Sequence, residues 1–565
     1  MKNNKFLLVM IMSLFLFVTV ICPISACTAV YVGSEVSEDG HTYYGRSEDL
    51  VRTKRFVIYD HATHEPGEMY TENVYGFEME FPSETYRYSV VEDSALYGDA
   101  EMPFGEVGFN ELGVSLSATV TTEYSEEMEA IDPLTDGGIS ECGLAHILLG
   151  ASQSARHGVE YLGSIIDEKG TAENYLLFIA DEEEVWAFEA VSGHQWVAVK
   201  MPADKVAVIP NHMIIGKVDL TDTENVIASE GLVATAEEAG TLVEEDGMIN
   251  VMKSYSAPFD SYDSYRAWAG SQFLAPSREI SENQDYYEFM FEPDEKVSLM
   301  DLRHLLSIRY EDQEYSWNNG ITEENATIRP IGVQRQAEVH IMDLDQTIST
   351  QWQCMGPIEF SVSVPFYTRL MTETPEMMQM YELDPVSGQY DWTFRTLTSL
   401  CAIDREMYGT NVRAYWDAYQ EALIEANKDV VTKINELYAK DPEAAEVKAT
   451  ELAAAISQEA ASRAEQITSE LIFYITNQEG ELGKAVTRGT EVEPFMPSLL
   501  EEGVFTEYNF DMKPVETVET PEVAEPVETE TVTEGASAGT VVLTAVVAAA
   551  VGAGVVYFVL KKKTK

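Results

Sequence analysis

The sequence predicts an α+β fold in which helices cover layers of antiparallel strands, and two observations predict it. Short apolar runs with strand character recur between residues 28 and 199, in two groups separated by one helical block. A later stretch, residues 411–475, is rich in Ala, Glu, Lys and Leu at helical spacing. Because strands and helices come in blocks and do not alternate one by one, antiparallel layers are favoured over a parallel sheet.

The elements follow in order along the chain. Strands are expected at residues 28–32, 55–60, 86–91 and 113–119, helices at 143–150 and 159–166, and a three-stranded meander at 175–180, 185–190 and 196–199. Residues 411–475 predict two long helices that break near Asp441 and Pro442. We expect this helical hairpin to cover a sheet.

The composition excludes several classes of protein. The 565 residues include 97 Asp and Glu but only 36 Lys and Arg, which gives a net charge of −61. Such a surface repels the phosphate backbone, so nucleic acid is not an expected partner. A hydrophobic fraction of 45% supports a folded core, and five cysteines in this length give no disulfide framework.

The N-terminus has the pattern of a signal peptide. Lys2 and Lys5 precede an apolar run at residues 6–21, and small residues lead to Ala26. We therefore predict a signal peptide over residues 1–26. Its removal makes Cys27 the first residue.

The C-terminus predicts a membrane anchor. After a body at residues 27–510 comes a stalk rich in Pro, Glu and Thr at 511–539, an uncharged apolar segment at 540–560 and a basic tail at 561–565. Such a segment crosses about 30 Å of hydrocarbon as a helix. The basic tail favours a cytoplasmic C-terminus, which places the body outside the cell membrane in a single-pass protein.

The chemistry of the body starts at Cys27. A cysteine at a new N-terminus offers a thiolate nucleophile and an α-amine whose pKa of roughly 7.7–8.0 suits a general base. An arginine nearby would favour the thiolate, and an aspartate could orient the amine. Arg46 and Asp49 are the candidates, because residues 45–49 follow a predicted second strand and a hairpin would return them to Cys27. No metal or organic cofactor is needed.

Four motifs, in this order along the chain, resemble the C69 family of dipeptidases. They are Cys27-Thr28, Gly45-Arg46-Ser47-Glu48-Asp49, Asn110-Glu111-Leu112-Gly113-Val114 and Ser192-Gly193-His194-Gln195-Trp196-Val197-Ala198. The pattern is more distantly similar to choloylglycine hydrolases and penicillin V acylases, which are N-terminal-nucleophile (Ntn) hydrolases. The resemblance covers residues 27–211 and returns more weakly at 266–268 and 355–365. It implies a four-layer αββα sandwich.

The resemblance also implies roles for six residues. Cys27 is the nucleophile, Arg46 lies beside the thiolate, Asp49 contacts the α-amine, Asn110 donates to the oxyanion, Asn211 gives a second polar contact, and Arg266 is a further active-site arginine. The implied protein is a cell-surface cysteine dipeptidase that hydrolyses dipeptides or short peptides.

Three alternatives stay open at this point. The enzyme could be an amidase of non-peptide acyl amides, of the penicillin V or bile-acid type, which would accept substrates without a free α-amine. The body could instead be a non-catalytic surface module that binds peptides or partners. Residues 24–27 also fit a lipoprotein signal, in which a lipid would occupy the Cys27 sulfur. The sequence leaves the dipeptide preference, the agent that exposes Cys27 and association into a homo-oligomer undecided.

Overall fold

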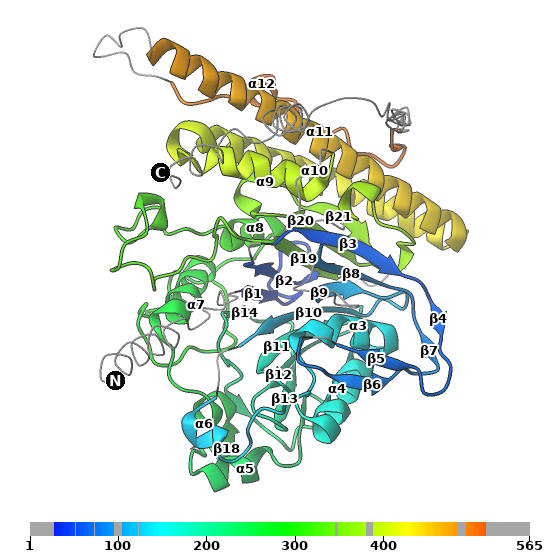
Figure 1. The fold of residues 1–565 in the computed structure, drawn as a ribbon, viewed down its shortest axis with the longest axis vertical. Helices are drawn as coiled ribbons and strands as arrows, with labels where there is room; N and C mark the ends of the chain where they lie inside the picture. Colours follow the sequence, from blue (N-terminus) through cyan, green and yellow to red (C-terminus); the bar gives the residue numbers. More distant parts are fainter. Residues whose placement is uncertain are drawn as a thin grey trace, which may run out of the picture. The chain divides into compact units, whose positions relative to one another are not determined.

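Two antiparallel sheets stacked face to face form the centre of the molecule (Figure 1). The structure is a computed structural model, and it describes residues 27–50, 52–72, 74–94, 104–121, 124–344, 348–379, 388–482 and 493–515. The predicted signal peptide, most of the stalk and the predicted membrane segment at 540–560 lie outside the described residues. Among the helices within them, none is long and apolar enough to cross a membrane.

The first sheet contains strands that lie far apart along the chain. Its six strands, in spatial order, are β14 (Val206–Ile209), β1 (Thr28–Val32), β2 (Thr42–Glu48), β19 (Glu338–Leu344), β20 (Thr350–Met355) and β21 (Val364–Tyr367). β1 is buried along its whole length, as its continuous apolar run predicts. The strand expected at residues 28–32 is therefore present, whereas β19 and β20 were not predicted.

The second sheet contains the predicted meander. Its eight strands, in spatial order, are β16 (Val226–Ala228), β13 (Trp196–Lys200), β12 (Val185–Ala190), β11 (Tyr175–Ala180), β10 (Ser115–Val120), β9 (Gly105–Phe109), β8 (Tyr88–Asp93) and β3 (Lys54–Tyr59). The inner faces of the two sheets meet through Tyr44, whose ring centroid lies 5.4 Å from that of Phe178. The Tyr44 hydroxyl also donates to Ser115 Oγ at 2.7 Å.

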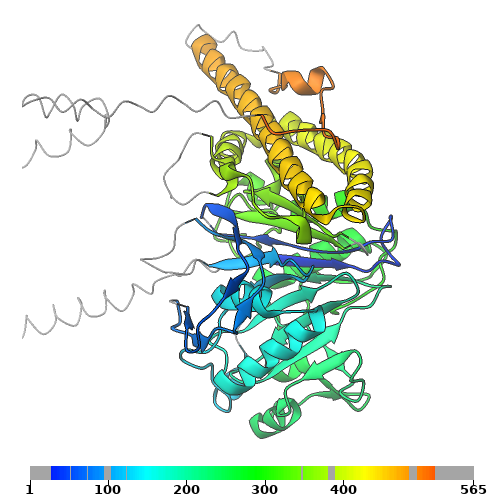
Figure 2. The same ribbon diagram turned by 90° about the vertical axis from the view of Figure 1, so that its right-hand side faces the viewer.

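Helices cover the outer face of each sheet. The second sheet is covered by α3 (Glu141–Ala151) and α4 (Ala155–Lys169), and the first by α9 (Tyr390–Cys401), α10 (Thr410–Tyr438) and α11 (Pro442–Leu482). Figure 2 shows the long helices, yellow to orange, on one side of the stacked sheets and the cyan helix on the other. The order of layers is helix, sheet, sheet, helix, as the αββα expectation requires.

The long helical hairpin breaks where the sequence predicts. Asp441 lies between α10 and α11, and its side chain accepts a hydrogen bond from Ala444 N at 3.2 Å, as a helix N-cap does. Pro442 then occupies the first helical position, where the missing N–H costs nothing. α11 continues seven residues past the predicted end at Ile475 to Leu482.

Shorter elements fill the surroundings of the sandwich. The remaining helices are α2 (Glu126–Glu129), α5 (Leu232–Ala239), α6 (Val251–Tyr255), α7 (Ser261–Leu274), α8 (Leu299–Leu306) and α12 (Ser498–Glu501). The remaining strands are β4 (Ala62–Thr63), β5 (Met69–Thr71), β6 (Glu78–Glu80), β7 (Glu84–Thr85), β15 (Lys217–Val218), β17 (Glu244–Glu245) and β18 (Met248–Asn250). Of these, α7 bears directly on the candidate site.

Candidate active site

Cys27 lies at the start of β1, at one end of the stacked sheets. β1 pairs antiparallel with β2, and Ala29 is opposite Arg46 in the register. The predicted hairpin therefore brings Arg46 back to the nucleophile. One detail differs from the expectation, because Arg46 lies within β2 and not after it. The strand continues to Glu48 because β2 is held on both sides, by β1 and by β19.

The Arg46 side chain is fully buried and points at the thiol. Its Nη1 donates to Cys27 Sγ at 3.1 Å, and its Nε donates to Ser117 Oγ at 3.3 Å. The other terminal nitrogen, Nη2, donates to Glu106 Oε2 at 2.5 Å. The guanidinium is thus fixed by β9 and β10 of the second sheet and presents one N–H to the sulfur.

Arg266, on α7, contacts the backbone of the same residue. Its Nη1 donates to the carbonyl oxygen of Cys27 and, at 3.2 Å, to Thr28 Oγ1. The same nitrogen donates to Asn211 Oδ1 at 3.0 Å. The amide of Asn211 in turn donates to Val120 O at 2.8 Å and to Thr119 Oγ1 at 3.3 Å. The structure therefore brings Cys27, Arg46, Asn211 and Arg266 together.

Asp49 is buried near the nucleophile, and an arginine that the sequence did not indicate holds it. Arg329 Nη2 forms an ion pair with Asp49 Oδ2. The other carboxylate oxygen, Oδ1, has no hydrogen-bond partner among the described residues. Asp49 therefore keeps one acceptor atom free. No motif surrounds Arg329, so only the fold could reveal this partner.

The side chain of Asn110 already forms hydrogen bonds with other groups. Its amide nitrogen donates to Leu149 O at 3.0 Å and Ser152 O at 2.8 Å, so both of its N–H groups are used. Its Oδ1 accepts from the backbone of Leu112 and Val114, both at 3.0 Å. Asn110 closes the turn between β9 and β10 and ties it to the end of α3. The contact of this side chain with an oxyanion stays a prediction, and it would require Asn110 to give up one of these hydrogen bonds.

The surroundings of Cys27 suppress its ionisation in the unprocessed chain. Burial raises the pKa of the thiol to about 12, the positive charge of Arg46 lowers it, and Glu106, Glu141 and Asp49 raise it. The largest cause is the loss of water around the sulfur. In this chain the nitrogen of Cys27 is also part of the peptide bond to Ala26, so it is no base.

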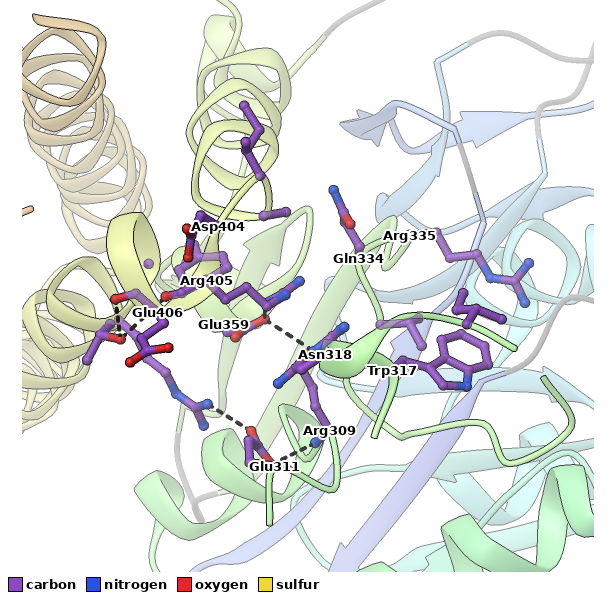
Figure 3. Close-up of a pocket in the computed structure, with 18 residues that line it drawn as sticks. Arg309, Glu311, Trp317, Asn318, Gln334, Arg335, Glu359, Asp404, Arg405 and Glu406 are labelled. Carbon is purple, nitrogen blue, oxygen red and sulfur yellow. Dashed lines mark hydrogen bonds and ion pairs between the residues drawn. The ribbon is translucent and has the colours of Figure 1, made fainter. Parts of the chain in front are cut away.

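A polar cavity of about 820 Å³ lies on another part of the surface (Figure 3). Four arginines line it, namely Arg309, Arg335, Arg405 and Arg413. Three of them form ion pairs with two lining acids, Arg405 and Arg309 with Glu359 and Arg413 with Glu311. None of the six predicted site residues lines it. Hydrogen bonds to the nucleophile, and not cavity size, therefore define the candidate site.

Arg335 connects this cavity with the nucleophile. Its Nη2 donates to the Tyr262 hydroxyl at 3.1 Å. The Tyr262 ring lies 5.3 Å from the guanidinium of Arg266 and 5.4 Å from that of Arg329. One aromatic ring thus packs beside both arginines that hold the Cys27 surroundings.

Comparison with known proteins identifies the family. The model of peptidase family C69 matches residues 26–418, which is more than half of the chain. The chain belongs to peptidase family C69. The prediction of a cysteine-type peptidase of this family is confirmed, and its nucleophile candidate is the first residue after the predicted leader.

Several bacterial proteins are similar over most of this C69 chain. A probable dipeptidase B of Streptococcus pyogenes is 31% identical over 79% of this chain and 93% of its own length. A probable dipeptidase of Latilactobacillus sakei is 29% identical over 82% and 97%. A dipeptidase of Bifidobacterium longum is 28% identical over 66% and 77%.

Among solved structures, a conjugated bile acid hydrolase from Clostridium perfringens matches 60% of this chain and 92% of its own. The identity is 13% and the TM-score is 0.27.

Proposed function

We propose that this C69 peptidase is a cysteine dipeptidase whose active form begins at Cys27. The observation that carries the proposal is the contact of Arg46 Nη1 with Cys27 Sγ at 3.1 Å, in a chain of this family. A buried guanidinium beside a sulfur stabilises the thiolate, which is the nucleophilic form. The dipeptidase names of the relatives from Streptococcus and Bifidobacterium support the substrate class.

Processing supplies the base. Cleavage after Ala26 frees the Cys27 α-amine, which accepts the thiol proton as the sulfur attacks the peptide carbonyl. The amine then gives that proton to the departing amino group, and the acyl group stays on the sulfur as a thioester. Water hydrolyses the thioester, with the same amine as base, and regenerates the thiol. The unpartnered Asp49 Oδ1 is our candidate for holding the amine.

Asn211 replaces Asn110 as the candidate donor to the oxyanion. The side-chain amide of Asn211 is hydrogen-bonded to Arg266, which is itself hydrogen-bonded to the carbonyl oxygen of Cys27. Of the two hydrogen bonds that this amide donates, the one to Thr119 Oγ1, at 3.3 Å, is the longer. Exchanging that contact for a developing oxyanion would cost little. Asn211→Ala should therefore lower kcat by about 10²–10³-fold, with a smaller change in KM.

The test uses the full-length chain after processing, with Cys27 verified as the N-terminus by intact mass. Hydrolysis of free dipeptides and of their N-acetylated forms is followed by mass spectrometry. We expect cleavage of the free dipeptides, reduced at least about 10⁴-fold in Cys27→Ala. Cleavage of acylated substrates alone would instead indicate an amidase. An inactive protein with a lipid on Cys27 would exclude catalysis by this sulfur.

We also propose that the protein is anchored at the cell membrane, with its body outside. The support is sequence alone, namely the leader at 1–26 and the apolar segment at 540–560 before the basic tail. Deletion of residues 540–565 should release the protein into the medium. Retention of the truncated chain with the cells would contradict the anchor.

A further inference from the structure

Near the nucleophile lies a buried carboxyl group, one oxygen of which has no hydrogen-bond partner among the described residues. Glu141 is the first residue of α3 and is 3% exposed. Its Oε1 accepts no hydrogen bond within the described parts of the chain. A carboxylate taken out of water without a partner is costly, so natural proteins rarely keep one. Such a group calls for an explanation in terms of a ligand.

The fold fixes Glu141 at the same end of the sandwich as Cys27. The backbone N–H of Glu141 donates to Glu173 Oε1 at 2.8 Å. Glu173 lies two residues before the start of β11, where Tyr175 is paired with Val120 at the end of β10. Val120 is the residue whose carbonyl holds Asn211. An unbroken series of contacts thus runs from the Cys27 site to Glu141.

The charge of Glu141 acts on the Cys27 thiol. The negative charge of Glu141 raises the pKa of the Cys27 thiol, as does that of Glu106. In turn, burial first and then Glu106 and Glu173 raise the pKa of Glu141 well above its usual range. The surroundings of Cys27 therefore bury several acidic groups that raise one another's pKa.

The buried cations near Cys27 already form ion pairs with other carboxylates. Arg46 contacts Glu106 at 2.5 Å, Glu338 at 3.8 Å and the thiol. Lys54 lies 2.6 Å from Glu48 and 2.8 Å from Asp93. Like Glu141, Glu106 has one oxygen, Oε1, without a hydrogen-bond partner. Two buried acceptors on neighbouring elements thus lack a donor, and one more cation would satisfy both.

We propose that Glu141, together with Glu106 Oε1, binds the α-ammonium group of the substrate. This inference rests on the proposed dipeptidase function. In a free dipeptide the α-nitrogen is separated from the scissile carbonyl carbon by one Cα, a distance of about 2.5 Å. When that carbonyl meets Cys27 Sγ, the ammonium group must therefore enter the buried surroundings of the sulfur. It brings three donors and the missing positive charge.

This assignment makes Glu141 a specificity-determining residue. A substrate that carries a methyl group in place of the ammonium group would leave the two carboxylate oxygens without donors. Discrimination of this kind is strong, because the penalty falls on unpaired groups in the protein. Free N-termini would be selected, and N-acylated substrates would be rejected.

The test compares alanyl-alanine with isobutyryl-alanine, in which a methyl group replaces the ammonium group at nearly the same volume. The processed full-length enzyme is assayed as wild type and as Glu141→Gln, which keeps the shape and removes the charge. We expect kcat/KM for alanyl-alanine to fall about 10- to 100-fold, chiefly through KM, and that for isobutyryl-alanine to stay the same or rise. Glu141→Asp should restore part of the preference.

Two further measurements separate recognition from a merely structural role. Glu189→Gln changes another buried glutamate, which accepts hydrogen bonds from Ile214 N and Ile215 N; it should leave the ratio of the two substrates unchanged. In wild type, KM for alanyl-alanine should rise as pH exceeds the pKa of the substrate amine, near 8. Glu141→Gln should lose this dependence.

The outcomes distinguish this inference from the proposed function. If wild type cleaves alanyl-alanine and Glu141→Gln shows the same substrate ratio and pH dependence, the role of Glu141 is wrong and the dipeptidase stands. If wild type prefers isobutyryl-alanine, the proposed function fails and the inference with it.

Discussion

The Cys27 end of the sandwich and the helical layer of α9, α10 and α11 are both buried, but they are built in opposite ways. The helical layer packs apolar side chains such as Trp416, Leu423 and Leu452 at helical spacing. The Cys27 end buries arginines and carboxylates, and it leaves acceptors on Asp49, Glu106 and Glu141 without donors. The helical layer also holds polar atoms without a hydrogen-bond partner among the described residues, such as Trp416 Nε1 and Tyr419 Oη. The difference between the two regions is therefore the charge that the Cys27 end buries, and buried charge of this kind is typical of a functional site.

Arg46→Gln should have the largest effect, because it should lower both stability and kcat. Glu106 and Glu338 would lose their buried cation, which costs roughly 3–5 kcal/mol of unfolding free energy, and the thiolate would lose its partner. We expect kcat to fall about 10²–10³-fold in addition. Urea unfolding and steady-state kinetics measure the two effects.

Arg55→Gln is the matched control for this change. Arg55, on β3 of the second sheet, forms an ion pair with Glu92 on β8 at 2.6 Å. The Arg55→Gln variant should be less stable than wild type and should keep the kcat of wild type. Equal loss of kcat in both variants would mean that Arg46 acts only on the fold.

Trp416→Ala tests the other half of the comparison. Trp416 on α10 is fully buried between aromatic rings, so its truncation should cost roughly 3–5 kcal/mol. The kcat of the molecules that remain folded should be that of wild type. A large drop in kcat per folded molecule would show that the helical layer also shapes the site.

The pH dependence of stability sharpens the contrast between paired and unpaired carboxylates. Burial raises the pKa of Glu189 from 4.5 to about 8, although two backbone N–H groups lower it. The native state therefore binds a proton more tightly than the unfolded state, and Glu189 destabilises the fold as pH rises from about 4.5 to 8. Glu189→Gln should flatten this part of the curve of unfolding free energy against pH. A slope equal to that of wild type would exclude the contribution.

Asn110→Ala should have a small effect on stability and on kcat. The turn between β9 and β10 would lose its side-chain hydrogen bonds, which costs about 1–3 kcal/mol. Because the amide does not reach the nucleophile, kcat should stay within about threefold of wild type. A loss of kcat comparable to that expected for Asn211→Ala would restore Asn110 to the catalytic machinery.

The sequence predicted the layers better than the site. Apolar runs such as Thr28–Val32 and the helical spacing of residues 411–475 are local signals, and local signals set strands and helices. β19 was not predicted because its sequence mixes Glu338, His340 and Asp343 with apolar residues. Those polar side chains are stabilised by partners that only the folded chain brings near.

Among the site residues, too, those with a local sequence signal could be predicted and those without one could not. Arg46 could be predicted because it lies opposite β1 in a hairpin, which sequence spacing reveals. The sequence does not show that the Asn110 side chain holds a turn that ends at Gly113, which has a φ of +89°, because its partners Leu149 and Ser152 lie on another element. Arg329 and Glu141 carry no motif, since their meaning depends on Asp49 and Cys27, which are far away along the chain.

The three hydrogen bonds of Arg266 Nη1 have one more consequence. The first residues of a chain normally fray, because a terminus loses few contacts when it leaves its neighbours. A catalytic atom on the first residue would then move over several ångströms and would rarely be positioned to react with the substrate. Arg266 joins the Cys27 carbonyl and Thr28 to Asn211 on another segment. After the leader is cut away, the new chain end is therefore expected to remain as ordered as the middle of a strand.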